Sequence, residues 1–148
     1  MTTERLGLGT STLAWMTRWA VAIIFLAAAP QKILAPADFA QNIAGFAILP
    51  DVLINFTALT LPWLEMIVVI LLVCRVWTGP ALFLANLMFA VFLAAVVSAY
   101  LRGMDIDCGC FGASTAASSS MTWYIVRDTL FLLLGLAAAW FNRASSRF

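Results

Sequence analysis

The chain has 148 residues, of which 64% are hydrophobic and 10% are charged, and its formal net charge is +1. Soluble domains are typically about half apolar and about a quarter charged, so this composition indicates a membrane protein. The near-neutral charge excludes a basic surface for nucleic acid. The absence of histidine excludes a His-ligated haem, a His-based zinc site and a histidine general base.

Four apolar stretches approach the roughly 20 residues that cross a bilayer as a helix. They cover residues 13–34, 53–74, 77–100 and 123–141. Backbone groups in lipid must be hydrogen-bonded within the protein, and no stretch alternates apolar and polar residues as a barrel strand does. The sequence therefore predicts an all-α fold, with residues 1–148 forming a single integral membrane domain, a four-helix bundle.

The segment between the first two stretches, residues 35–52, has a helical pattern of its own. Its apolar side chains that share one helical face are Phe39, Ile43, Phe46 and Ala47. This pattern predicts a short helix lying at the outer membrane interface. We expect Pro36 to begin this helix and Pro50 to end it.

Besides Arg18 near the start of the first stretch, charged residues interrupt the apolar stretches at four positions: Lys32, Glu65, Arg127 and Asp128. An acid near the bilayer centre costs about 2.5–3.5 kcal/mol on insertion scales, so Glu65 should face the bundle interior and pair with Lys32 or Arg127. Asp128 is a candidate counter-ion for its neighbour Arg127 or for Arg102. Glu65 has two interpretations, a structural polar clamp or a contact for a proton or a quinone headgroup.

The distribution of basic residues predicts the orientation in the membrane. With the N-terminus inside, the cytoplasmic side carries Arg5, Arg18, Arg75, Arg143 and Arg147, and the outer side carries Lys32, Arg102 and Arg127. We therefore expect a multi-pass protein of the inner membrane with both termini in the cytoplasm. The loop of residues 102–121 then faces the periplasm, and Cys74 lies on the opposite side.

That loop contains two cysteines one residue apart, Cys108 and Cys110. Two such thiols can act as attacker and resolver in thiol–disulfide exchange, and strained, exposed disulfides tend to be labile. The alternatives are an inert disulfide that pins the loop, or a Cu(I) site that also uses Met104 and Met121. A zinc site is disfavoured because two thiolates supply half of a tetrahedral ligand set and no histidine completes it.

The sequence around the cysteines resembles the signature DCGCFG of the MauE family, within the broader DoxX-like group. The matching residues are Asp107, Cys108, Gly109, Cys110, Phe111 and Gly112. Two further segments are similar to the family pattern in the same order, the run Leu61–Glu65 and the pair Arg127-Asp128. The turn that ends in Lys32 departs from it, because Pro30 stands where glycine is expected.

The resemblance implies a four-helix membrane protein associated with redox maturation of periplasmic proteins. It implies catalytic roles for Cys108 and Cys110, with a periplasmic thioredoxin-like protein or a client protein as partner, besides membrane lipid. A membrane quinone is a candidate electron acceptor by analogy, and we expect no resident metal. The alternative is a non-enzymatic accessory subunit of a larger membrane complex, in which the disulfide only shapes a docking loop.

Overall fold

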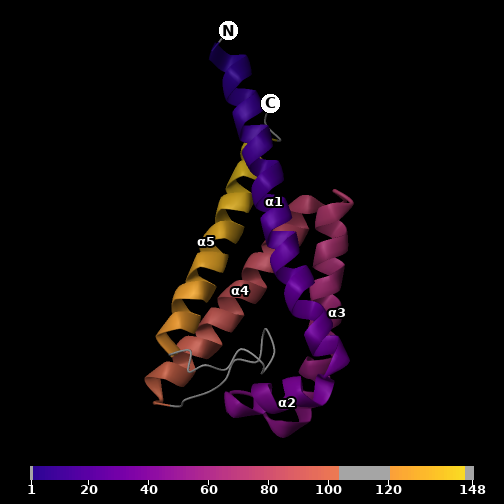
Figure 1. Cartoon of the computed structure of the whole chain (residues 1–148), viewed down its shortest axis with the longest axis vertical. Helices are drawn as coiled ribbons and strands as arrows, with labels where there is room; N and C mark the ends of the chain where they lie inside the picture. Colours follow the sequence, from indigo (N-terminus) through magenta and orange to yellow (C-terminus); the bar gives the residue numbers. More distant parts are fainter. Residues whose placement is uncertain (1, 104–120, 146–148) are drawn as a thin grey trace.

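The computed structural model describes residues 2–103 and 121–145, and within those residues every regular element is a helix. The helices are α1 (Thr2–Leu34), α2 (Pro36–Gly45), α3 (Asp51–Val73), α4 (Thr78–Leu101) and α5 (Met121–Ser145), as Figure 1 shows. Four of them contain an apolar segment long enough to cross a membrane: Ser11–Leu34, Asp51–Val73, Thr78–Leu101 and Thr122–Ser145. The predicted all-α four-helix membrane bundle is confirmed.

The helices extend beyond the predicted apolar stretches at two places. Helix α1 begins at Thr2, ahead of its apolar segment, and α5 continues to Ser145 rather than ending near residue 141. Polar residues such as Glu, Arg and Ser are tolerated in a helix, so backbone hydrogen bonding continues after the hydrophobic pattern has stopped. Hydropathy therefore located the spans but not the helix ends.

The bundle is closed on three sides and looser on the fourth. Helix α1 packs against both α3 and α5, and α4 packs against α5, whereas α3 and α4 contact each other less. The beginning of α1 and the end of α5 lie at one end of the bundle, and α2 lies across the other end (Figure 1). We call the looser contact between α3 and α4 the α3–α4 seam.

Helix α2 confirms the predicted short helix but ends earlier than expected. It begins at Pro36 and ends at Gly45, not at Pro50. The helix stops because Ala47 has a φ of 48°, in the left-handed region that a continuing helix cannot use. Pro50 instead precedes the first turn of α3, where a proline is readily accommodated.

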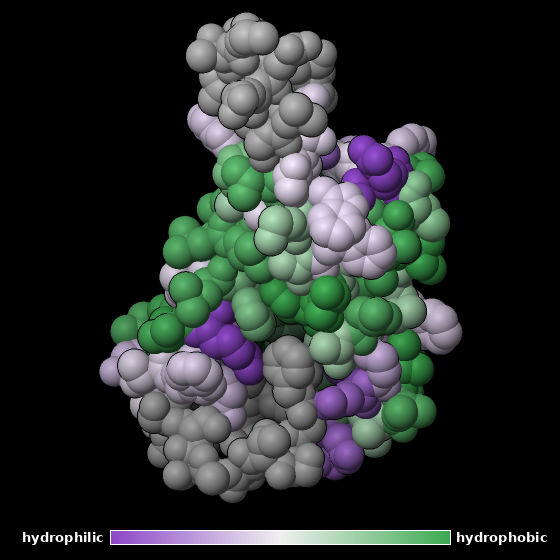
Figure 2. All heavy atoms as spheres, turned by 45° about the horizontal axis from the view of Figure 1, so that its top comes forward, coloured by the Kyte–Doolittle hydropathy of each residue, from purple (hydrophilic) through white to green (hydrophobic). Residues whose placement is uncertain are grey.

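The core of the bundle is built from apolar side chains of the long helices. Phe25 of α1 stacks on Phe89 of α4 with ring centroids 4.8 Å apart, and Phe89 also lies 5.9 Å from Phe131 of α5. Small residues such as Ala85 and Ala99 are fully buried, which lets helix backbones approach closely. On the face drawn in Figure 2, hydrophobic side chains cover the broad middle of the molecule, as expected for a surface that contacts lipid.

Candidate functional site

The central polar feature is an ion pair between α1 and α3. Lys32 Nζ lies 2.5 Å from Glu65 Oε1, and the two side chains are only 3% and 1% exposed. Lys32 lies in the last turn of α1, and Glu65 lies one turn after Pro62 in α3. The predicted pairing of Glu65 with Lys32 is confirmed, and it joins two membrane-spanning helices.

Two aromatic rings complete the surroundings of the ammonium group. Lys32 Nζ lies 5.1 Å from the ring centroid of Phe39 in α2 and 5.0 Å from that of Phe92 in α4. A cation over an aromatic face at this distance is attracted by the ring quadrupole. Lys32 therefore contacts α2, α3 and α4 from its position on α1.

The second carboxylate oxygen of Glu65 takes no part in the ion pair with Lys32. Glu65 Oε2 is buried and has no hydrogen-bond partner among the described residues. A buried carboxylate oxygen without a partner costs about 1–3 kcal/mol or more. Such an atom in a native site calls for an explanation, such as a water or a ligand that supplies a donor.

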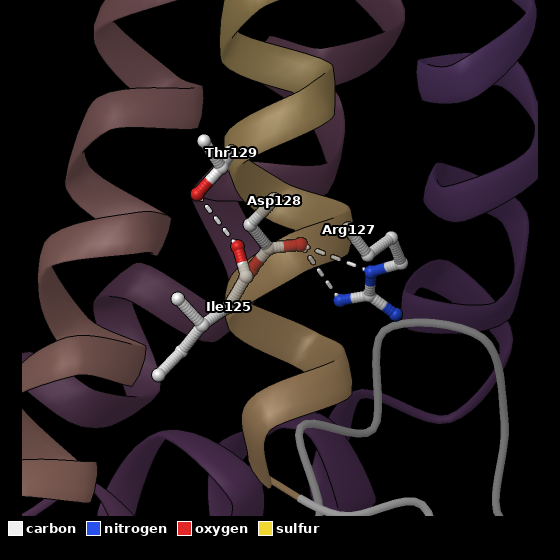
Figure 3. A network of polar contacts seen from close by, with 4 residues as sticks. All are labelled: Ile125, Arg127, Asp128 and Thr129. Carbon is white, nitrogen blue, oxygen red and sulfur yellow. Dashed lines mark hydrogen bonds and ion pairs between the residues drawn. The ribbon is translucent and has the colours of Figure 1, made fainter.

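A second ion pair lies within α5. Arg127 Nε and Nη2 lie 3.0 Å and 2.9 Å from Asp128 Oδ1, and Figure 3 shows the guanidinium folded back toward the carboxylate of its sequence neighbour. Arg127 also lies over the rings of Tyr124 and Phe131, at 5.1 Å and 5.8 Å. The expected pairing of Asp128 with Arg127 is confirmed. In the same helix, the Thr129 hydroxyl donates to the carbonyl of Ile125 (Figure 3).

The two ion pairs lie around one small cavity. Its lining includes Lys32, Glu65, Arg127 and Asp128, which we call the charge cluster, together with phenylalanines from α1, α4 and α5. Lys32 is also close enough to Asp128 to interact with it electrostatically. The charge cluster holds two positive and two negative groups and is therefore balanced.

A larger cavity adjoins the charge cluster. It has a volume of about 390 Å³ and lies at the α3–α4 seam, with α2 across its end. Nearly all of its lining is apolar, and the ionisable residue among its lining is Asp128. Phe92 and Asp128 line both cavities, so the charge cluster lies at one wall of the larger space, which we call the apolar cavity.

Arg102 fastens the end of α4 to the end of α2. Its Nη2 donates to the carbonyl of Phe46 at 2.5 Å and its Nη1 to that of Ala47 at 3.3 Å, while its Nε donates to the carbonyl of Ser98 in α4. These contacts fix the position from which the chain leaves α4, beside the apolar cavity.

The predicted cysteine site lies outside the described residues. This holds for Cys108 and Cys110 and for the supporting residues Asp107, Gly109, Phe111 and Gly112. Cys74 is a free, exposed thiol in the turn after α3. Within residues 2–103 and 121–145, no group of three or more cysteine or acidic side chains could hold a metal ion.

The sequence did not reveal the rings beside Lys32 or the apolar cavity. Phe39 was assigned to a helix face at the interface, yet it is 4% exposed and lies against the ammonium group. Phe92 is one of several phenylalanines in an apolar helix, and no spacing sets it apart. The cavity follows from how far α3 and α4 separate, which a hydrophobic pattern does not encode.

Comparison with known proteins gives consistent matches along the chain. The family model described as methylamine utilisation protein MauE matches residues 10–141. A methylamine utilization protein MauE of Paracoccus denitrificans is 35% identical over 127 residues, covering 84% of this chain and 67% of that protein. A protein of the same name from Methylophilus methylotrophus is 31% identical over 117 residues, covering 78% of this chain and 62% of that protein.

The matched region spans about two thirds of the length of these relatives. It includes all five helices of the bundle in whole or in large part. No solved structure matches the chain.

Proposed function

The chain belongs to the MauE family of methylamine utilisation proteins, and we propose that it is a membrane thiol–disulfide redox protein that exchanges electrons through Cys108 and Cys110. The partner would be a periplasmic thioredoxin-fold protein that takes part in maturation of other periplasmic proteins. The observation that carries the proposal is the Cys-Gly-Cys sequence in the segment that connects two membrane-spanning helices, α4 and α5.

The exchange step can be written with the atoms of both proteins. A thiolate of the reduced partner attacks one sulfur of the Cys108–Cys110 disulfide, and a mixed disulfide forms as the other sulfur leaves as a thiolate. The second partner thiolate then attacks the mixed disulfide. The partner leaves as a disulfide, and the pair is left as two thiols that hold the two electrons.

The bundle geometry supports pairing within the motif rather than with Cys74. Cys74 precedes α4, a helix of 24 residues that is about 36 Å long, and Gly103 follows it. Cys110 comes seven residues after Gly103, which is at most about 25 Å of extended chain. A sulfur tethered to the far end of α4 therefore has no route to Cys74.

The orientation of the proposed site follows from the arginine distribution. We propose that the protein lies in the inner membrane with its cysteine loop in the periplasm, where disulfides persist. After reduction, a membrane-impermeant maleimide added to intact spheroplasts should label Cys108 and Cys110 and leave Cys74 unlabelled until the membrane is opened. Labelling of Cys74 alone in intact spheroplasts would show that the orientation is opposite to the one proposed.

Trapping of the mixed disulfide tests the exchange itself. The Cys110→Ser variant, incubated with a thioredoxin whose resolving cysteine is replaced by serine and whose remaining sulfur carries a thionitrobenzoate leaving group, should release thionitrobenzoate and accumulate a Cys108-linked adduct that mass spectrometry identifies. The Cys74→Ser variant is the matched control and should behave as wild type. An adduct linked through Cys74, or none at all, would favour the alternative function of a non-enzymatic accessory subunit of a larger membrane complex.

A further inference from the structure

The apolar cavity and the charge cluster together have the features of a ligand site. Small-molecule sites are concave, mostly apolar spaces of about 300–1,000 Å³ with a few convergent polar groups. The apolar cavity, at about 390 Å³, falls in this range. Its ionisable lining residue, Asp128, lies with Phe92 at the wall shared with the small cavity that Lys32 and Glu65 line. Its other polar lining residues are Asn42 of α2 and Thr57 of α3.

The charge cluster indicates what kind of polar head would bind. Its two cations and two anions form two ion pairs, so an added phosphate or amine would leave one charge uncompensated in a buried site. An uncharged head with hydrogen-bonding groups does not disturb this balance. Glu65 Oε2, buried and without a partner among the described residues, is the atom that such a head would satisfy.

The aromatic lining indicates the shape of that head. Phe39 from α2, Phe46 directly after α2 and Phe92 from α4 all line the apolar cavity, and the rings of Phe39 and Phe92 lie against Lys32. Aromatic rings stack well on flat ligands. The remaining walls are aliphatic, from residues such as Leu61 and Leu64 of α3, and suit a hydrocarbon tail.

We propose that the apolar cavity binds a lipophilic quinone, with the ring at the wall that Asp128 and Phe92 share with the charge cluster, one ring oxygen directed into the small cavity, and the isoprenoid tail along the aliphatic walls. A quinone is flat and uncharged. Its carbonyl oxygens accept hydrogen bonds, and in the reduced form its hydroxyl groups donate them, so that the quinol can satisfy Glu65 Oε2. The site lies at the end of the bundle where α4 ends and α5 begins, so it is near both anchors of the cysteine segment.

The role of the bound quinone rests on the proposed function, whereas its binding does not. If the Cys108 and Cys110 thiols have been reduced by a partner, the quinone would reoxidise them. Two S–H bonds break and one S–S bond forms, while the two quinone oxygens gain two protons and two electrons and become the hydroxyls of the quinol. No further oxidant is needed for this step.

A cavity-filling substitution tests the binding with a matched control on the same helix. Ala95 lines the apolar cavity, and the neighbouring Ala94 is exposed on the outside of α4. Decylubiquinone is the probe, added to the purified full-length protein in detergent, with binding followed by the shift in thermal unfolding midpoint. We expect Ala94→Phe to bind like wild type and Ala95→Phe to bind at least tenfold more weakly.

A second pair of measurements tests whether the polar head matters. Decanol carries a chain of the same length without the ring, and Glu65→Gln changes the head contact while keeping a hydrogen-bonding side chain. The proposal predicts that wild type prefers the reduced form, decylubiquinol, to decanol, and that Glu65→Gln loses most of this preference, because a carboxylate oxygen accepts from the quinol hydroxyl more strongly than an amide oxygen does. Equal binding of both compounds, as for a space that takes any lipid chain, would overturn the proposal, as would equal binding by Ala94→Phe and Ala95→Phe.

Variants of the two cysteines distinguish quinone binding by the bundle from the proposed redox function. The Cys108→Ser/Cys110→Ser double variant should bind decylubiquinone with unchanged affinity, because the described lining of the apolar cavity, from the helices and the α2–α3 connection, is unchanged in it. Loss of binding in this double variant would count against a site formed by the bundle. Binding in wild type without oxidation of the reduced cysteine pair would contradict the redox function and leave the binding site standing.

Discussion

The two ion pairs of the charge cluster have the same charges but different places in the fold. Lys32 and Glu65 come from positions 33 residues apart, and they join α1 to α3 with side chains 3% and 1% exposed. Arg127 and Asp128 are adjacent in one helix, and their side chains are 16% and 10% exposed. The first pair therefore fixes how two helices pack, whereas the second pair neutralises charge within one helix.

The largest expected effect comes from breaking the pair between helices. Glu65→Leu or Lys32→Met leaves the remaining partner charged and buried, which typically costs about 3–5 kcal/mol. We expect a loss of this size in the free energy of unfolding, measured by equilibrium denaturation in mixed micelles. Glu65→Gln should cost less than Glu65→Leu, because the amide can still accept a hydrogen bond from Lys32. If the two single variants unfold like wild type, the pair does not hold α1 and α3 together.

The double variant Lys32→Met/Glu65→Leu sharpens the same comparison. Replacing a buried ion pair by apolar residues of similar size is often close to neutral, because neither charge is left alone. We therefore expect the double variant to be more stable than either single variant, again by equilibrium denaturation. Additive losses would mean that the two residues act independently, despite their contact.

The pair within α5 should matter less for stability. Asp128→Asn removes one charge but leaves a side-chain oxygen that can accept from Arg127, and the more exposed guanidinium retains its stacking on Tyr124 and Phe131. We expect a loss of about 1 kcal/mol or less, in the range of partly exposed pairs. A loss as large as that of Glu65→Leu would show that the two pairs are equivalent and that the contrast drawn above is wrong.

The smallest global effect is expected from Arg102, whose bonds lie at the surface. Arg102→Ala removes the donors to the carbonyls of Phe46 and Ala47. Since the side chain is exposed, we expect the unfolding free energy to change by less than about 1 kcal/mol. Hydrogen exchange should nevertheless increase at the end of α2, and Arg102→Lys should recover only part of the protection, because a single ammonium nitrogen lacks the planar fork whose two nitrogens reach the two carbonyls. If hydrogen exchange at the end of α2 is unchanged in Arg102→Ala, then the hydrogen bonds of Arg102 do not hold α2 against the end of α4.

Much of the fold was predictable from the sequence, because a helix that crosses lipid must be apolar over about 20 residues and must pair any charge that it buries. Apolar length located four spans, and the cost of a buried acid predicted that Glu65 would find a basic partner. The early end of α2 was not predictable, since it depends on the left-handed backbone at Ala47, a residue type that rarely adopts it. The apolar cavity was hidden for another reason. It results from looser packing between α3 and α4, and side chains that face a cavity look like those that face lipid.

The charge cluster and the cysteine pair were predicted from different kinds of sequence information. The charge cluster followed from individual residues, and the structure brings all four of them around one cavity. The cysteine pair followed from a motif and lies outside the described residues, so its role stays a proposal. The Phe39 and Phe92 rings, which link the charge cluster to the apolar cavity, could be found only from the three-dimensional arrangement.

The reduction potential of the Cys108–Cys110 pair tests the central claim most directly. A titration with glutathione or dithiothreitol, followed by alkylation and mass spectrometry, measures it in the purified protein, with Cys74→Ser removing the third thiol. The redox function predicts a midpoint above about −300 mV, the value below which structural disulfides typically lie. A pair that stays oxidised at more negative potentials, in a protein whose Cys108→Ser and Cys110→Ser variants retain full function, would contradict the redox function.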